Sequence, residues 1–182
     1  LCQYRFVIVV MKSMDVLYVA GYGRSGSTVL DVLLGAHPQV VSVGELTYFG
    51  EEWAHPDRLC ACGSPYNQCS FWRNALNTQK EAQSLQKQVR CVEHRRSLPR
   101  LLAGVLPRES RQAYKNWMQY LFAHASGQAG ADIVVDSSKS AGDAAGRFWA
   151  LHEVADLDVR VLHLVRNGWA VLESVVEKGT NW

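Results

Sequence analysis

The sequence contains no long hydrophobic run. None of its apolar stretches approaches the ~18 residues that a transmembrane helix requires, so we expect no membrane span. The short apolar stretch 6–11 follows a single arginine and precedes no small-residue cleavage site, which argues against a secretory signal peptide. We therefore expect residues 1–13 to be an extension of the domain, and the protein to be cytoplasmic.

The sequence also lacks an excess of charge of either sign. Its 19 Lys and Arg residues against 17 Asp and Glu residues give a net charge of +2 at pH 7, whereas a nucleic-acid-binding domain normally carries a clear basic patch. With 48% hydrophobic and 20% charged residues among 182, the composition is that of one globular domain with a sizeable core. We expect no nucleic-acid partner, although a basic pocket for a polyanionic cofactor remains compatible with this balance.

Cysteines are few and odd in number, so disulfides are not expected in a reducing compartment. Of the five, Cys60, Cys62 and Cys69 lie close together in the sequence, but the zinc-binding spacing C-x2-C is absent. One interpretation is a zinc site with His55 as the fourth ligand. The interpretation we favour is a buried, aromatic-packed loop whose thiols are free or adventitiously oxidised. We predict no metal in the active site.

A glycine-rich run, GYGRSGST at 21–28, lies between an apolar, β-branched segment at 15–21 and a helical pattern at 27–38. A strand, a glycine-rich turn and a helix together point backbone N–H groups and the helix dipole at an anion. We expect the glycines at positions 21, 23 and 26 to adopt positive φ and to admit a ligand close to the backbone. The predicted anion-binding residues of the run are Gly23, Arg24, Ser25, Gly26, Ser27 and Thr28.

Three interpretations of this run from its residues alone stay open. A nucleotide P-loop would carry a lysine where Ser27 stands, so a kinase is disfavoured. GYGRSG also fits the dinucleotide fingerprint G-x-G-x-x-G, and Glu45 follows at about the distance of a ribose-binding acid. The third interpretation is an ordinary tight turn between a strand and a helix, but three glycines, three hydroxyls and an arginine exceed what such a turn needs.

Three further strand patterns, at 40–43, 132–136 and 158–165, alternate with helical patterns. This order predicts an α/β fold, of the P-loop-like three-layer type, with a central parallel sheet flanked by helices. The most regular helical pattern covers 107–126 and ends at Gly127, and another covers 140–155. Because the carboxyl ends of parallel strands meet at one edge, we expect the polar residues that follow the strands to gather there.

The run GYGRSGSTVLDVLLGAHPQVVSVGEL resembles the 5′-phosphosulfate-binding segment of sulfotransferases that use 3′-phosphoadenosine 5′-phosphosulfate (PAPS), in particular the bacterial type. The family has a second motif, in which an arginine after a strand precedes a serine by eight residues. VRVLHLVRNGWAVLES carries Arg166 and Ser174 at this spacing. The resemblance implies that Arg166 and Ser174 bind the 3′-phosphate. Asn167-Gly168 stands where the family commonly has Asp-Pro, so we expect Asn167 to fix the turn without a rigid proline.

The resemblance also implies roles for polar residues after two other strands. Glu45 would be the base that takes the proton of the acceptor, and Lys139, with Arg24, would stabilise charge on the transferred group. In the run DSSK, Ser138 would contact the cofactor, although Ser137 or Ser138 could instead begin the next helix. Glu45 could instead cap the following segment or pair with Arg24.

The predicted function is therefore transfer of a sulfuryl group from PAPS to a hydroxyl or amine of a small molecule, carbohydrate or lipid. Members of the family usually continue with further helices, so we expect residues 1–182 to be one sulfotransferase domain that lacks its C-terminal part. The loop at 47–72 and the central helices would form the acceptor side. The alternatives are a Rossmann-type oxidoreductase and an inactive nucleotide-binding fragment.

Overall fold

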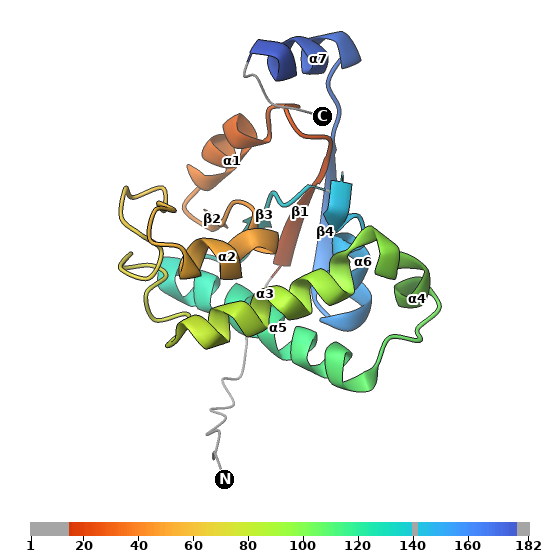
Figure 1. The fold of residues 1–182 in the computed structure, drawn as a ribbon. Helices are drawn as coiled ribbons and strands as arrows, with labels where there is room; N and C mark the ends of the chain where they lie inside the picture. Colours follow the sequence, from red (N-terminus) through yellow and green to blue (C-terminus); the bar gives the residue numbers. More distant parts are fainter. Residues whose placement is uncertain (1–14, 140–141, 178–182) are drawn as a thin grey trace.

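The computed structural model describes residues 15–139 and 142–177, and its centre is a parallel β-sheet (Figure 1). The strands are β1 (Asp15–Gly21), β2 (Val40–Ser42), β3 (Ile133–Asp136) and β4 (Asp158–Leu164). They lie in the order β2-β3-β1-β4, and all neighbouring pairs are parallel. The predicted α/β fold with a central parallel sheet flanked by helices is confirmed, and every strand agrees with its predicted bounds to within one residue. The predicted extension at 1–13 lies outside the described residues.

β1 is an inner strand and is paired on both sides. It pairs with β3 from Asp15 to Tyr18 and with β4 along its whole length. Val16, Tyr18 and Val19 are buried, as their apolar and β-branched pattern predicts. β4 is an edge strand, and each of its residues is exposed or half-buried.

The predicted helix at 107–126 is α5 (Arg108–Ala129), and it is longer than expected. One face of the helix is buried, at Tyr114, Met118, Leu121, Phe122 and Ala125, while Trp117 beside this face is half-buried. The helix continues past Gly127 and ends where Gly130 takes a left-handed conformation, with φ 64°, and donates its N–H to the carbonyl of Ser126. Pro107 is the N-cap residue, directly before the first helical position.

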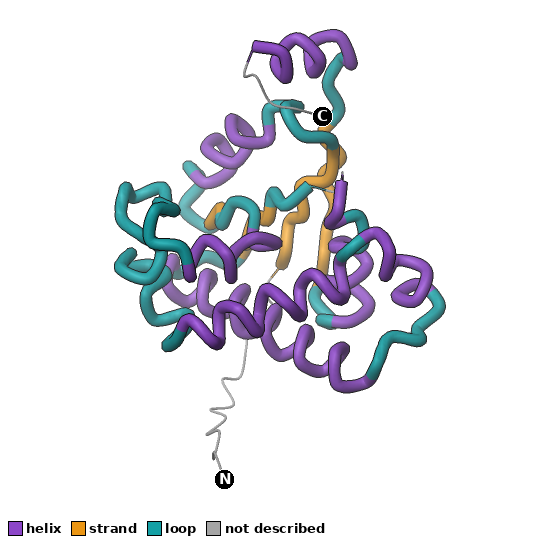
Figure 2. Tube along the Cα trace, in the orientation of Figure 1, coloured by secondary structure: helices purple, strands orange, loops and turns teal. Residues whose placement is uncertain are grey.

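α5 packs against β2 and β3 and against α3 (Gln79–Glu93), so these two helices form a layer on the sheet (Figure 2). The short helix α2 (Phe49–Ala54) packs on α3. α1 (Ser27–Gly35) contacts β2 and β3, and α7 (Gly168–Glu177) lies beyond the carboxyl end of β4 (Figure 1). No helix within the described ranges is both long enough and apolar enough to cross a bilayer.

The helix expected at 140–155 is divided. Its described part consists of a 3₁₀ turn at Gly142–Ala144, then α6 (Arg147–Trp149), which continues as a π-helical turn over Ala150–Val154. Two glycines account for the interruption. Gly142 has φ 84°, and a Cβ on Gly146 would lie 2.8 Å from the carbonyl oxygen of Glu93. Neither Ser137 nor Ser138 begins a helix, so their predicted capping role is wrong. Residues 140 and 141 are outside the described ranges.

A buried ion network joins the sheet to the helical layer. Arg147 donates from Nε to Asp136 Oδ2 (2.7 Å), at the end of β3, and from Nη1 to Glu93 Oε1, at the end of α3. Glu93 also accepts hydrogen bonds from Thr47 Oγ1 (2.7 Å) and from the hydroxyl of Tyr114 (2.8 Å). The three charged side chains are almost fully buried. Their charges are therefore balanced by one another and by hydrogen bonds, since water does not reach them.

We expect Arg147→Met to destabilise the protein by about 3–5 kcal/mol, because it leaves two buried carboxylates without a cation. Burial raises the pKa of Glu93, and the charge of Arg147 opposes that rise. In the variant the folded state therefore binds a proton more readily than the unfolded chain does. The loss of stability should then be smaller at about pH 5 than at about pH 8, as measured by urea denaturation.

Arg95→Met is the matched control. Nε of Arg95 lies 3.3 Å from Asp143, and both side chains are exposed. An exposed pair of this kind contributes less than about 1 kcal/mol. An equal effect of the two substitutions would contradict a stabilising role for the buried network.

Candidate functional site

The loops that follow the four strands meet at one edge of the sheet. Because all four strands are parallel, their carboxyl ends share this edge, where open α/β sheets bind ligands. The predicted site residues follow Gly21 of β1, Ser42 of β2, Asp136 of β3 and Leu164 of β4. We call this region the carboxyl edge.

The glycine-rich loop depends on two of its three glycines for its backbone geometry. Gly21 has φ 147°, and a Cβ there would lie 2.5 Å from the carbonyl oxygen of Leu164 on β4. Gly26 has φ 98° and is the N-cap residue of α1. Gly23 does not adopt positive φ, so that expectation is wrong, and Arg24 takes the left-handed conformation with φ 65°.

The N-terminus of α1 faces the loop without a side-chain cap. Gly26 has no side chain that could accept a hydrogen bond from the first N–H groups of the helix. The hydroxyl-bearing residues beside it differ in exposure, since Ser25 and Ser27 are buried and Thr28 is exposed. Free N–H groups at the positive end of a helix dipole form an anion-binding position.

The two sequence motifs contact each other. Arg166, two residues past the end of β4, donates a hydrogen bond from Nη1 to the carbonyl oxygen of Arg24 (2.9 Å). The side chain of Asn167 accepts from the N–H of Trp169 (2.9 Å), so the prediction that Asn167 fixes the turn is confirmed. Ser174 is half-buried in α7, and within the described residues it makes no hydrogen bond with Arg166.

Glu45 and Lys139 form an ion pair across the carboxyl edge. Nζ of Lys139 contacts Oε1 of Glu45, and both side chains are partly exposed, Lys139 at 18% and Glu45 at 39%. Glu45 therefore pairs with Lys139, and the alternative pairing with Arg24 is not observed among the described contacts. The hydroxyl of Tyr18 donates to the carbonyl of Lys139, which fixes the backbone at this point.

Both arginine and lysine of the predicted catalytic set have a strained backbone. Among the described non-glycine residues, only Arg24 (φ 65°), Lys139 (φ 60°) and Asp156 (φ 57°) have positive φ. The left-handed region costs an ordinary residue about 1–2 kcal/mol. Such residues concentrate at ligand-binding and catalytic sites, where the strain holds a side chain in a required position.

Asp31 is a site residue that sequence reasoning missed. Its carboxylate accepts hydrogen bonds from Ser42 Oγ (3.0 Å) and Ser137 Oγ (2.6 Å), so it ties α1 to the ends of β2 and β3. Partial burial raises the pKa of Asp31, and the two serine hydroxyls oppose that rise. An acid within the apolar pattern of 27–38 is the signal that could have identified it.

Ser138 is buried, and its hydroxyl is already engaged. It donates to Asp136 Oδ1 (2.5 Å) and accepts from the N–H of Thr47 (3.1 Å). Asp136 belongs to the buried network of Arg147. Ser138 thus connects the network to the segment after Glu45, and a contact between its hydroxyl and a cofactor stays a prediction.

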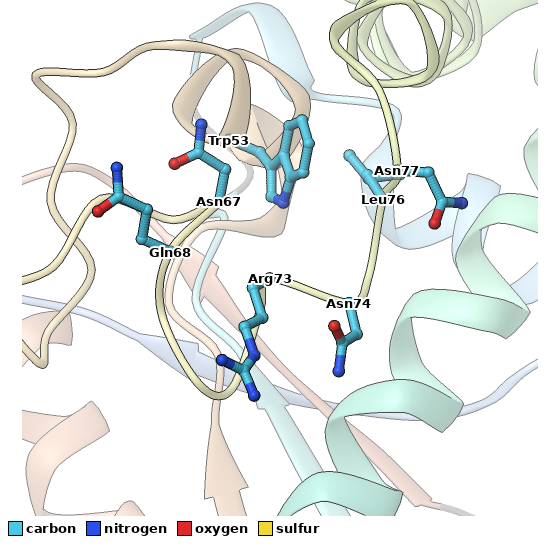
Figure 3. A pocket seen from close by; sticks show the side chains of 7 residues that line it. All are labelled: Trp53, Asn67, Gln68, Arg73, Asn74, Leu76 and Asn77. Atoms are coloured by element: carbon cyan, nitrogen blue, oxygen red, sulfur yellow. The ribbon is translucent and has the colours of Figure 1, made fainter.

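A polar cavity lies on the long loop between α2 and α3, and it has a volume of about 660 Å³. Figure 3 shows its lining side chains, which are Trp53, Asn67, Gln68, Arg73, Asn74, Leu76 and Asn77. Neither Glu45 nor Lys139 lines it. The prediction that the 47–72 segment contributes to an acceptor site is compatible with this cavity but is not tested by it.

The same loop brings three thiols together. The sulfur atoms of Cys60, Cys62 and Cys69 lie within 4.8 Å of one another. His55 is not part of this group, and its Nδ1 lies 3.9 Å from Asp57, so the structure does not support its predicted role as a fourth ligand. Burial raises the pKa of Cys60 to about 11.

The left-handed backbone of Arg24 can be tested by its effect on stability. We expect Arg24→Gly to be more stable than Arg24→Ala by about 1 kcal/mol, because only glycine adopts positive φ without a steric cost. The free energy of unfolding in urea measures this difference.

Lys87 supplies the control pair. It is exposed in the middle of α3. There the order should reverse, with Lys87→Gly less stable than Lys87→Ala by about 1 kcal/mol. The same order at both positions would show that residue 24 does not have a left-handed conformation in solution.

The site is defined by the geometry of its own residues. Four loops bring two arginines, a lysine, a glutamate and an uncapped helix N-terminus to one edge of a parallel sheet. In the comparisons with known proteins, no family model and no curated protein matched the chain.

Proposed function

We propose that the protein is a PAPS-dependent sulfotransferase whose active site is the carboxyl edge. The observation that carries the proposal is the pairing of residues from distant loops, since Lys139 contacts Glu45 and Arg166 contacts the backbone of Arg24. A sulfuryl transferase needs cations for a polyanionic donor and a base for the acceptor. The carboxyl edge has both.

The donor would bind along the edge from α1 to β4. Its 5′-phosphosulfate would accept hydrogen bonds from the N–H groups of residues 23–28, at the N-terminus of α1. Arg166 is exposed at the end of β4 and would contact the 3′-phosphate, since its guanidinium can make paired hydrogen bonds to phosphate. Ser174 would contact the same phosphate from α7.

The ion pair of Glu45 and Lys139 suits an in-line transfer. The anionic sulfuryl group would attract Lys139, and Glu45 would then be free to take the proton of the acceptor. The acceptor oxygen forms a bond to sulfur while the bond from sulfur to the bridging phosphate oxygen breaks. Lys139 and Arg24 would stabilise the charge that moves to the leaving group, 3′,5′-adenosine bisphosphate.

The two alternatives, an oxidoreductase and an inactive fragment, would leave some of these residues without a function. In a Rossmann-type oxidoreductase, Glu45 would bind a ribose, but the contact of Arg166 with the glycine-rich loop would have no function. An inactive nucleotide-binding fragment would bind the bisphosphate and transfer nothing. We favour a small-molecule, carbohydrate or lipid acceptor, no nucleic acid, and a cytoplasmic location.

Calorimetric titration with 3′,5′-adenosine bisphosphate, 5′-AMP and NAD tests the cofactor. We expect only the bisphosphate to bind tightly, and Arg166→Ala to weaken it by about 10-fold to 100-fold, because a charge-assisted hydrogen bond is worth about 1.5–3 kcal/mol.

Arg160→Ala is the control, since Arg160 lies on β4, the strand that precedes Arg166, and pairs with Asp15, at the opposite end of β1 from the glycine-rich loop. The Arg160→Ala variant should bind 3′,5′-adenosine bisphosphate with the affinity of the wild type. Preferential binding of NAD would favour the oxidoreductase, and equal binding of 5′-AMP and the bisphosphate would contradict recognition of the 3′-phosphate.

The role of Glu45 can be measured separately from binding. We expect Glu45→Gln to lower the rate of sulfuryl transfer from radiolabelled PAPS by at least about 100-fold, which is typical for loss of a general base. The affinity for the bisphosphate should not fall, because Lys139 is then released for the anion. An unchanged transfer rate would exclude Glu45 as the base.

A further inference from the structure

We propose that Cys60, Cys62 and Cys69 bind one zinc ion, which fixes the long loop between α2 and α3. The site lies outside the carboxyl edge and does not depend on the sulfotransferase proposal. The sequence allowed a zinc site here as one interpretation, but C-x-C is not the usual pair of zinc ligands, and its spacing did not favour the site. The argument rests on how the loop folds.

The backbone places Cys60 and Cys62 on a tight turn. The N–H of Gly63 donates to the carbonyl of Cys60 (2.8 Å), and the N–H of Cys60 donates to the carbonyl of Ser64 (2.9 Å). Gly63 has φ 82°, which lets the chain reverse directly after Cys62. This turn brings the two thiols to the same side although they are only two residues apart.

Cys69 approaches the same point from inside the protein. The chain turns back after Pro65, whose carbonyl accepts the N–H of Cys69 (2.9 Å). Cys69 is only 2% exposed and belongs to the same core cluster as the buried Phe49 and Trp72. The core therefore fixes the position of the Cys69 sulfur. The turn at 60–64 places the thiols of Cys60 and Cys62 next to it.

The distances between the sulfur atoms fit a shared metal ion. Sγ of Cys69 lies 3.4 Å from Sγ of Cys60 and 3.5 Å from Sγ of Cys62, and all three atoms lie within 4.8 Å of one another. Thiolates at about 2.3 Å from a tetrahedral zinc ion are separated by about 3.8 Å. A single disulfide would use two of these sulfurs and leave the third, whereas a metal uses all three.

The ligand set favours zinc over harder ions. Thiolates select zinc and other soft metals, while calcium and magnesium require oxygen ligands. No fourth His, Cys, Asp or Glu joins the three within 15–139 and 142–177. Cys62 is exposed, so the fourth position would open to solvent on its side and be filled by water.

A metal would also explain how the loop keeps its shape. Within 55–78 the chain forms no helix and only one isolated β-bridge, between Leu59 and Pro65. Loops of more than ~15 residues without secondary structure are uncommon in compact domains. Zinc on three points of the loop would order the segment that lines the polar cavity of Figure 3, because Cys69 lies between Gln68 and Arg73 of its lining.

The test measures the metal content of the full-length protein, produced with zinc in the medium and purified without chelator. We expect about one zinc per chain by mass spectrometry of the metals, and release of three thiol protons per ion when zinc is added back to the reduced apoprotein. Cobalt(II), used as a spectroscopic probe, should bind with the same stoichiometry and give sulfur-to-metal charge-transfer bands.

Cys62→Ser is the main variant, because Cys62 is exposed and its replacement leaves the core unchanged. We expect it to weaken zinc binding by more than about 100-fold, since loss of even an outer-shell partner costs about 10–100-fold. Cys69→Ser should do the same, but Cys69 is buried and the variant also tests folding.

Cys91→Ser is the matched control, since Cys91 is an exposed thiol outside the group. It should bind zinc as the wild type does. The proposal is wrong if the reduced wild type binds no zinc, if Cys62→Ser binds it as tightly as Cys91→Ser, or if the protein as isolated contains a disulfide among the three cysteines and no metal.

Discussion

The buried ion network around Arg147 is the interaction on which the rest of the structure depends. It connects the end of β3, through Asp136, to the end of α3, through Glu93. Replacing such a network by apolar side chains often stabilises a protein, whereas removing one partner is costly. The network here fixes the positions of neighbouring segments. Asp136 also accepts a hydrogen bond from the hydroxyl of Ser138, and that hydroxyl accepts one from the N–H of Thr47. The segments that carry Lys139 and Glu45 are thereby fixed to the same buried point.

At the carboxyl edge, two charged residues have a strained backbone, and contacts between loops keep them in place. Arg24 and Lys139 have left-handed conformations that ordinary residues avoid, and each is held by a contact from elsewhere in the chain. Arg166 binds the carbonyl of Arg24, and Tyr18 binds the carbonyl of Lys139. Strain of this kind persists only where the surrounding structure over-determines it. The loop near the three cysteines is ordered differently, by hydrogen-bonded turns and by the packing of its aromatic side chains in the core.

Much of the fold could be predicted because its signals are local. The β-branched runs gave the four strands to within one residue, and the alternation of strands and helices gave a parallel sheet. The errors lie where local signals compete. Gly127 resembled a helix end, but the helix continues to Ala129, directly before Gly130. The helix expected at 140–155 is interrupted by glycines that pack closely or reverse the chain. The sequence could not show which glycine of the loop takes positive φ.

What the sequence by itself determined is the chemistry available at each strand end, because residue type and order along the chain are local properties. It placed an acid after β2, a lysine after β3 and an arginine after β4, and the parallel sheet then put them on one edge. Only the tertiary structure decided which of them meet. Glu45 pairs with Lys139, Asp31 joins two serines from different strands, and three thiols converge while His55 lies apart. These contacts depend on how segments that are distant in the sequence pack together. The hydrophobic periodicity of the sequence does not predict such packing.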